Sequence, residues 1–311
     1  MENTQKQDSP PVSDLFDHLE TIPLVWFNAA LIGSFLFYFI LSNVAHVIAD
    51  LYYSPSFTQQ LPSDIVQLQR WIFQPLAETI YPVIQPILNW WSIRHEQCIL
   101  VMPNHVEALR AFRSKRHEII QCWIMSFVHA LGTALIFAWA WFPNTESIEE
   151  KEERVKLMFM HTGGYFLADT IVNPSVMFAL HHLCPLPFLH ILIVNSCPLF
   201  SAALSLGFAE DGNTVAHAMT LWTCKTGTRF QVIRALSFWI SRPISMTYAF
   251  LSWAYDIPDE YHGTWKGKLC FCMFLAVAGI NFGWMLVMIA PQRVRDAAIR
   301  MVNGTSTVKM D

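Results

Sequence analysis

Charged side chains are scarce in this sequence, and several motifs of soluble proteins are missing. Asp, Glu, Lys and Arg supply only 14% of the 311 residues, whereas 53% are apolar. The basic residues are too few and too scattered for a nucleic-acid-binding surface, so no nucleic-acid partner is expected. A Gly-rich phosphate loop, an internal repeat and a low-complexity tract are also absent. These absences direct attention to the apolar runs and to a lipid bilayer as the solvent.

Metal-binding and disulfide patterns are missing as well. The seven cysteines form neither a CxxC pair nor a zinc-like spacing, and we interpret them as reduced packing residues. A di-iron membrane hydroxylase would need several HxxxH and HxxHH boxes, but only one His-His pair occurs here. We therefore expect neither a metal nor a bound cofactor. The NPxxY and DRY motifs of rhodopsin-like receptors do not occur, and a transporter is only a minor alternative because no inverted halves are evident.

Long apolar runs recur along the chain. A bilayer core of about 30 Å requires roughly 20 apolar residues per helix. Such windows lie at 23–45, 118–142, 156–178, 183–197, 199–224, 235–255 and 268–290, the fourth being short and the fifth interrupted by Glu210 and Asp211. The sequence therefore predicts an all-α, polytopic membrane protein with about seven transmembrane helices. We divide these into one anchor helix at 23–45 and a six-helix bundle within 118–290.

The charges outside these runs predict the orientation of the chain. Residues 1–22 are acidic and lack the basic start of a cleaved signal, so the first helix is expected to remain as an anchor. With seven spans, the basic clusters before the second span, before the sixth and after the seventh all fall on one side. The positive-inside rule makes that side cytosolic. The N-terminal tail, 1–22, is then luminal and the C-terminal tail, 291–311, cytosolic.

The segment 46–117 is the long region without a predicted span. Its middle, from Trp71 onward, is apolar, but three prolines and Glu78 disfavour a straight transmembrane helix. An added crossing would also place the basic clusters on opposite sides. We expect a cytosolic, interfacial or re-entrant segment anchored by Trp71, Trp90 and Trp91.

Several polar residues lie inside the predicted spans. A charged side chain at membrane depth costs at least about 2.5 kcal/mol, so each one needs a partner or a hydrated cavity. At about 1.5 Å per helical residue, one layer in the cytosolic half of the membrane contains Asp169, His181, His182, Glu210, Arg242 and Asn281. We expect these residues to line a polar chamber.

Helical spacing groups further polar residues with this layer. Glu210, Asn213, Thr214 and His217 follow the i, i+3, i+4, i+7 pattern of one helix face. A second polar stripe contains His161, Tyr165, Asp169 and Asn173.

Structural roles are the alternative interpretation of these residues. Arg242 is expected to pair with Glu210 or Asp169, and Asn281 to hydrogen-bond between helices. Tyr165 is expected to support the layer, and His217 and His190 to be packing or rim histidines.

The His181-His182 pair is placed at the start of the fourth span, where it would face the carboxylate of Asp169. A general base needs a pKa near neutral and a group that orients it, and a histidine beside a carboxylate supplies both. The residue pattern leaves two interpretations open, catalysis and a structural cap.

The order of these segments resembles the TLC-domain family, which includes ceramide synthases. The matching pieces run from about Arg116 to Ala290 and are WIMSFVHAL (123–131), GYFLAD (164–169), HH (181–182), the Glu of FAED (208–211), SRPIS (241–245) and NFGW (281–284). The resemblance implies a six-helix core with a leading anchor, residence in the endoplasmic reticulum, and a role in lipid metabolism, sensing or trafficking. In the ceramide synthases of this family, the paired histidines and downstream acids transfer an acyl group from acyl-CoA to a sphingoid amine.

This chain departs from the ceramide synthases. Their His-Asp downstream of the paired histidines is replaced by Phe208-Ala-Glu-Asp-Gly-Asn213, and no homeobox-like segment is evident. The resemblance therefore favours the smaller TLC-domain proteins.

Two classes of function follow from the sequence, with membrane lipids as the expected partners. In the first, His181 or His182, oriented by Asp169 or Glu210, acts as the base in acyl transfer with acyl-CoA as co-substrate. Arg242 or Asn281 is then the candidate oxyanion donor. In the second, the chain is a non-catalytic regulator of lipid homeostasis or a cargo receptor. A chaperone of nascent chains that uses 46–117 is a third interpretation, and the oligomeric state is not indicated.

Overall fold

The computed structural model describes residues 22–53, 63–141, 148–172, 176–194, 197–224 and 228–289. The tails predicted at 1–22 and 291–311 lie outside this part of the chain, apart from Ile22. Every regular element among the described residues is helical, which confirms the all-α class. The elements are α2 (Ile22–Tyr53), α3 (Ser63–Leu100), α4 (His105–Glu118), η2 (Ile119–Trp123), α5 (Ile124–Trp141), α6 (Ile148–Val172), α7 (Val176–Leu183), α8 (Pro185–Val194), α9 (Phe200–Thr223), α10 (Thr228–Leu251), η3 (Ser252–Asp256), α11 (Asp259–His262) and α12 (Trp265–Ile289).

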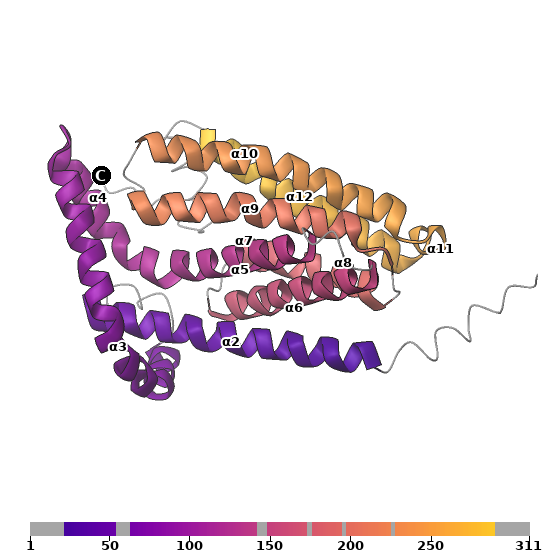
Figure 1. The fold of residues 1–311 in the computed structure, drawn as a ribbon, viewed down its shortest axis with the longest axis horizontal. Helices are drawn as coiled ribbons and strands as arrows, with labels where there is room; N and C mark the ends of the chain where they lie inside the picture. The colour runs from indigo at the N-terminus through magenta and orange to yellow at the C-terminus, as the bar shows by residue number, and fades with distance from the viewer. Residues whose placement is uncertain are drawn as a thin grey trace, which may run out of the picture.

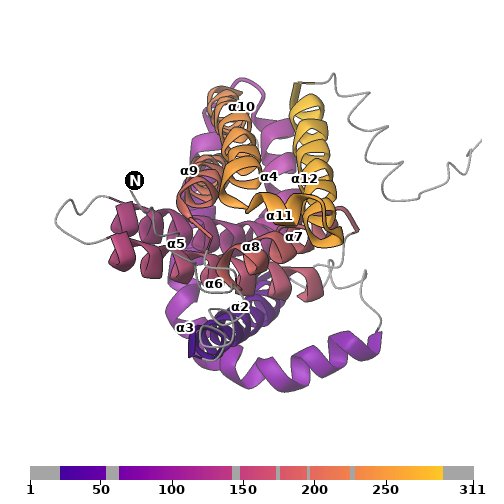
Figure 2. The ribbon, with the colours of Figure 1, turned by 90° about the vertical axis from the view of Figure 1, so that its right-hand side faces the viewer.

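The long helices lie side by side in one bundle (Figure 1). Seen along the bundle, α2 lies low in the view beside α3; α5, α6 and α8 lie across the middle, and α9, α10 and α12 lie above them (Figure 2). The most extensive contacts join α9 to α10, α2 to α6, and α5 to both α9 and α6. An apolar core fills the half of the bundle near α11, where it includes Phe159, Leu192 and Ile257.

Among the described residues, three helices are long and apolar enough to cross a membrane, at Asn28–Tyr53, Ile124–Trp141 and Trp265–Leu286. The helices α6, α9 and α10 have 25, 24 and 24 residues, which also exceeds the roughly 20 residues that a bilayer core requires. They are less apolar because the polar residues of the interior lie on them. The chain is thus compatible with a membrane protein.

The predicted third and fourth spans have different boundaries in the structure. The α6 helix ends at Val172, and His181 and His182 belong to the last turn of the short helix α7. The two histidines therefore close α7 just before α8 begins. The new helix, α8, begins at Pro185, whose fixed φ and missing N–H suit the first position of a helix and not its interior.

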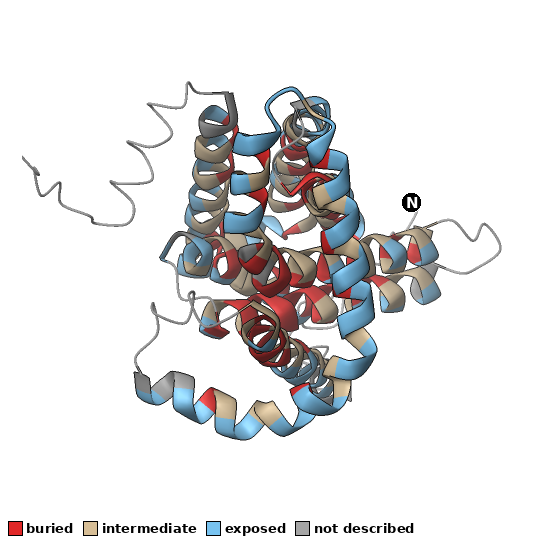
Figure 3. Ribbon diagram, turned by 90° about the vertical axis from the view of Figure 1, so that its left-hand side faces the viewer, coloured by how far each residue is buried: buried red, intermediate tan, exposed pale blue. Residues whose placement is uncertain are grey.

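The α3 helix runs crosswise over one end of the bundle (Figures 1 and 3). Pro75, Pro82 and Pro86 lie inside one helix of 38 residues, so they do not end it. Its inner side packs on α2 through an apolar cluster that includes Val47 and Leu88.

Trp91, one of the three tryptophans predicted to anchor this segment, packs against neighbouring helices. Its indole Nε1–H donates to the carbonyl oxygen of Leu221 near the C-terminal end of α9, over 3.3 Å. This contact fixes α3 across the end of α9.

Candidate functional site

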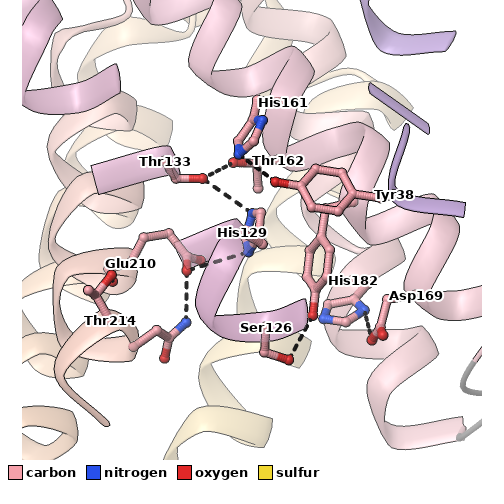
Figure 4. Close-up of polar contacts among 12 residues, drawn as sticks. Tyr38, Ser126, His129, Thr133, His161, Thr162, Asp169, His182, Glu210 and Thr214 are labelled. Carbon is pink, nitrogen blue, oxygen red and sulfur yellow. Dashed lines mark hydrogen bonds and ion pairs between the residues drawn. The ribbon is translucent and has the colours of Figure 1, made fainter. Parts of the chain in front are cut away.

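Buried and half-buried polar side chains from six helices meet inside the bundle (Figure 4). We call this group the polar layer. It consists of Tyr38 of α2, His129 of α5, His161, Tyr165 and Asp169 of α6, His182 of α7, Glu210 and Asn213 of α9, and Arg242 of α10.

His182 and Asp169 form the first histidine–carboxylate pair. The Nδ1 atom of His182 lies 3.4 Å from Oδ2 of Asp169, and the two residues are only 5% and 7% exposed. The imidazole stacks in parallel on the ring of Phe166, with centroids 4.6 Å apart. Phe166 and Asp169 are three residues apart on α6, so one face of this helix both supports and orients the imidazole.

The neighbouring His181 has a different environment. Its ring lies edge-on against Trp284 of α12, with centroids 4.8 Å apart. The structure therefore separates the two adjacent histidines, because only His182 faces the carboxylate of Asp169.

A second histidine–carboxylate pair joins His129 to Glu210. Nδ1 of His129 lies 3.8 Å from Oε2 of Glu210. On the other side of the ring, Nε2 lies 3.3 Å from Oγ1 of Thr133, which in turn lies 3.1 Å from Oγ1 of Thr162. The sequence analysis did not select His129. The available signal was the spacing of Ser126, His129 and Thr133, which places three polar groups on one face of an apolar helix.

Tyr38 makes α2 part of the site. Its hydroxyl lies 2.8 Å from Nε2 of His161, and Ser34 Oγ donates to the carbonyl oxygen of His161 over 2.9 Å. Gly164 permits this approach, because a Cβ there would lie 2.5 Å from the backbone nitrogen of Phe35. The helix expected to be only an anchor thus contributes a fully buried tyrosine to the polar layer.

Tyr165 connects the two pairs. Its ring stacks on that of His129 at a centroid distance of 3.9 Å and meets the ring of His182 edge-on at 5.7 Å. Its hydroxyl lies 3.0 Å from Oγ of Ser126. The two imidazoles are therefore held on different sides of one tyrosine ring.

Arg242 reaches Glu210 through an amide. Asn213 Nδ2 donates to Oε2 of Glu210 over 3.0 Å, and Arg242 donates to the Oδ1 atom of Asn213. Its guanidinium also lies 4.7 Å from the ring centroid of Phe238. We expected a direct pair with a carboxylate, whereas the contact runs through Asn213. Thr214 follows the predicted helix face, with its hydroxyl donating to the Glu210 carbonyl oxygen.

Other predicted residues lie outside this network. Asn281 is buried but donates to Val277 O in its own helix instead of bridging two helices. His217 packs against Trp123 with ring centroids 5.1 Å apart, and His190 is exposed on α8. Asn173 is not among the described residues.

The two histidines differ in whether a ring nitrogen remains available to accept a proton. In His129, both ring nitrogens face protein groups, the carboxylate of Glu210 and the hydroxyl of Thr133. In His182, Nδ1 lies 3.4 Å from the Asp169 carboxylate without forming a hydrogen bond, and Nε2 also has no hydrogen-bond partner among the described residues. A carboxylate that accepts the Nδ1–H would leave Nε2 as the basic atom. His182 is thus the better placed general base.

No known protein family, curated protein or solved structure matches this chain.

Proposed function

We propose that this chain is a seven-span TLC-type protein of the endoplasmic reticulum that binds a lipid in its polar layer and transfers an acyl group to it. Seven crossings follow if α7 and α8, which form the apolar segment Phe178–Val194, together make the short fourth one. In Figure 1 the helices α5 and α10 run in one direction along the bundle, and α2, α6, α9 and α12 run in the other. Because α6 and α9 run in the same direction, the chain must return along the bundle between them, through α7 and α8.

Charge supports a luminal N-terminus and a cytosolic C-terminus. The basic residues of α4 and of the start of α10 lie at the bundle end that α3 covers, including Arg110, Arg113 and Arg229. Asp256, Asp259 and Glu260 lie at the opposite end. The positive-inside rule makes the α3 end cytosolic, the side from which acyl-CoA arrives.

The reaction that suits the polar layer is acyl transfer from a thioester. Nε2 of His182 accepts the proton of an amine or hydroxyl on the acceptor lipid while that group attacks the thioester carbonyl carbon. The C–S bond then breaks, and the proton passes from the imidazolium to the departing CoA thiolate. Asp169 holds the imidazole and stabilises its positive charge.

Arg242 is the candidate donor to the developing oxyanion. Its Nε–H is buried and has no hydrogen-bond partner among the described residues. A preorganised donor of this kind typically contributes about 10²–10³-fold to the rate.

One observation carries the proposal. The His182–Asp169 pair is buried at membrane depth, where ionisable groups are costly, and yet neither imidazole nitrogen forms a hydrogen bond with the described residues. A purely structural cap would be expected to use both nitrogens, as His129 does.

The second candidate is a lipid-binding regulator without catalysis. It is favoured by the closed set of contacts among Tyr38, His161, His129 and Glu210, in which protein groups satisfy one another. In that function the polar layer fixes the helices around a ligand.

Product analysis separates the two candidates. Purified protein would be given labelled long-chain acyl-CoA with sphingoid bases and lysophospholipids, and the products would be identified by mass spectrometry. We expect His182→Gln to reduce acyl transfer by about 10²–10⁴-fold, because the base is lost. His190→Gln, at an exposed position, is the matched control and should retain activity.

The fold of each variant is checked by its melting temperature and by co-purified lipid. Absence of product with the wild-type protein, with lipid still bound, would overturn the transferase and leave the regulator. Equal activity of the wild-type and His182→Gln proteins would remove His182 from the chemistry.

A further inference from the structure

The α3 helix is apolar on two sides. Its inner side packs on the bundle through residues such as Ala77, Leu88 and Ile99. Its outward side is also apolar, and large side chains there are strongly exposed, with Trp71 at 78% and Val83 at 72%. The other members of this outward face are Leu68, Ile72, Leu76, Ile87, Trp90 and Ile93. A helix that shows apolar groups on both sides requires an apolar neighbour on the second side as well.

The position of α3 indicates what this neighbour is. The helix starts soon after the end of α2 and runs crosswise over the bundle end (Figure 3). If the bundle spans the membrane, the outward face lies at the level where the helices leave the bilayer. Tryptophan is enriched at that level, and apolar helix faces insert there.

A hollow on this face contains an arginine without an acidic partner. It is lined by Pro86, Asn89, Trp90, Ile93, Arg94 and Gln97. The guanidinium carbon of Arg94 lies 5.6 Å from the ring centroid of Trp90 and 5.7 Å from that of Trp222. Arg94 forms no ion pair with a described residue. A guanidinium that contacts aromatic rings and has no acidic partner is suited to bind a phosphate.

The charges around the hollow favour an anion. The nearest acid on the same helix, Glu96, is already bound by Arg113 over 3.1 Å and lies 3.8 Å from Arg116. Arg110 and Lys115 add positive charge on α4. Among the described residues, Arg94 thus has no acidic partner and lies beside exposed apolar side chains.

We propose that the outward face of α3 lies in the headgroup region of the cytosolic leaflet and that the Arg94 hollow holds the phosphate of an anionic phospholipid. The acyl chains of that lipid contact the apolar residues of the face. This inference rests on the membrane-spanning bundle and is independent of acyl transfer.

Depth measurement tests the location of the face. In a cysteine-free background, Val83→Cys would carry a fluorescent label, and the protein would be reconstituted in vesicles of phosphatidylcholine and phosphatidylserine. We expect strong quenching by lipids with a nitroxide near the headgroup and weaker quenching by mid-chain nitroxides. Accessibility to aqueous iodide without lipid quenching would overturn the proposal, and so would maximal quenching at mid-chain. Protection from both quenchers would indicate a second copy or another protein partner, which also overturns it.

Lipid retention tests the hollow. The protein would be purified from mixed micelles of the same two lipids, and the retained lipids would be quantified by mass spectrometry. We expect Arg94→Gln to lower the ratio of phosphatidylserine to phosphatidylcholine by about fivefold. Arg110→Gln removes the same charge from an exposed position outside the hollow and should have a smaller effect. Equal ratios in the two variants would show that only general charge attracts the lipid, which contradicts a site at Arg94.

Discussion

The contact between α2 and α6 at Gly164 gives a sharp test of how the polar layer is built. A Cβ atom on Gly164 would lie 2.4 Å from Oγ of Ser34 and 2.5 Å from the backbone nitrogen of Phe35. The serine hydroxyl can rotate away, but the Cβ atom of Ser34, also 2.5 Å away, and the backbone nitrogen cannot. Gly164→Ala should therefore push α2 away from α6.

The required displacement follows from these distances. Ordinary van der Waals contacts of a Cβ begin at 3.4 Å, so the Phe35 nitrogen must move by 3.4 − 2.5, or about 0.9 Å. The same movement would lengthen the 2.8 Å contact between Tyr38 and His161 to about 3.7 Å, beyond hydrogen-bond distance. Overpacking costs about 1–3 kcal/mol, and loss of the hydrogen bond adds about 1 kcal/mol. We expect a fall in Tm of about 5–10 °C.

Thermal unfolding of the purified protein in one detergent measures this effect, and Gly279→Ala is its control. A Cβ at Gly279 of α12 meets no atom within 4 Å, so alanine should be neutral or stabilise by up to about 1 kcal/mol through helix propensity. If Gly164→Ala melts at the wild-type temperature, α2 does not pack on α6 as described. An equal loss in both variants would show that the effect is not specific to this contact.

Three further predictions concern single contacts, each measured by Tm beside the wild type. Asn213→Ala should lower the Tm more than a substitution at an exposed position does. It removes the amide that links Glu210 to Arg242 and so leaves buried charge uncompensated. An unchanged Tm would contradict this link. Trp91→Phe should cost about 1 kcal/mol, since it removes the donor to a carbonyl at the end of α9. Tyr38→Phe should cost a similar amount and also lower acyl transfer if α2 helps to form the site; unchanged Tm and activity would remove Tyr38 from the network.

The order of the helices could be predicted because hydropathy has a simple physical cause. A bilayer requires long apolar runs, and those runs coincide with the long helices of the bundle. The break within the fourth run could not be located in the same way, because hydropathy does not respond to Pro185. The chemistry of proline, which ends one helix and starts the next, sets the position of His182 at the end of α7.

The polar faces were predictable where the signal lies within one helix. Glu210, Asn213 and Thr214 are close because three and four residues make one helical turn, and the structure joins them by hydrogen bonds. Asp169 was expected to face the histidine pair because both were placed at the same depth, and the structure brings it to His182.

The contacts that sequence reasoning missed depend on which helices are neighbours. Tyr38 is one aromatic residue among many in α2, and no pattern within that helix distinguishes it. It reaches His161 only because two helices approach closely at Gly164. Periodicity shows which residues share a face, but it does not show which face meets which helix.

The same limit explains why the sequence could not rank the histidines. His129 and His182 each lie beside a carboxylate, so residue type and depth describe them alike. What separates them is the hydroxyl of Thr133, which occupies the second nitrogen of His129 and has no counterpart at His182. A base must have a free nitrogen, and the neighbours of the imidazole decide whether it has one. In this bundle, the group that contacts the second ring nitrogen of each histidine is therefore a better guide to function than the carboxylate beside the first.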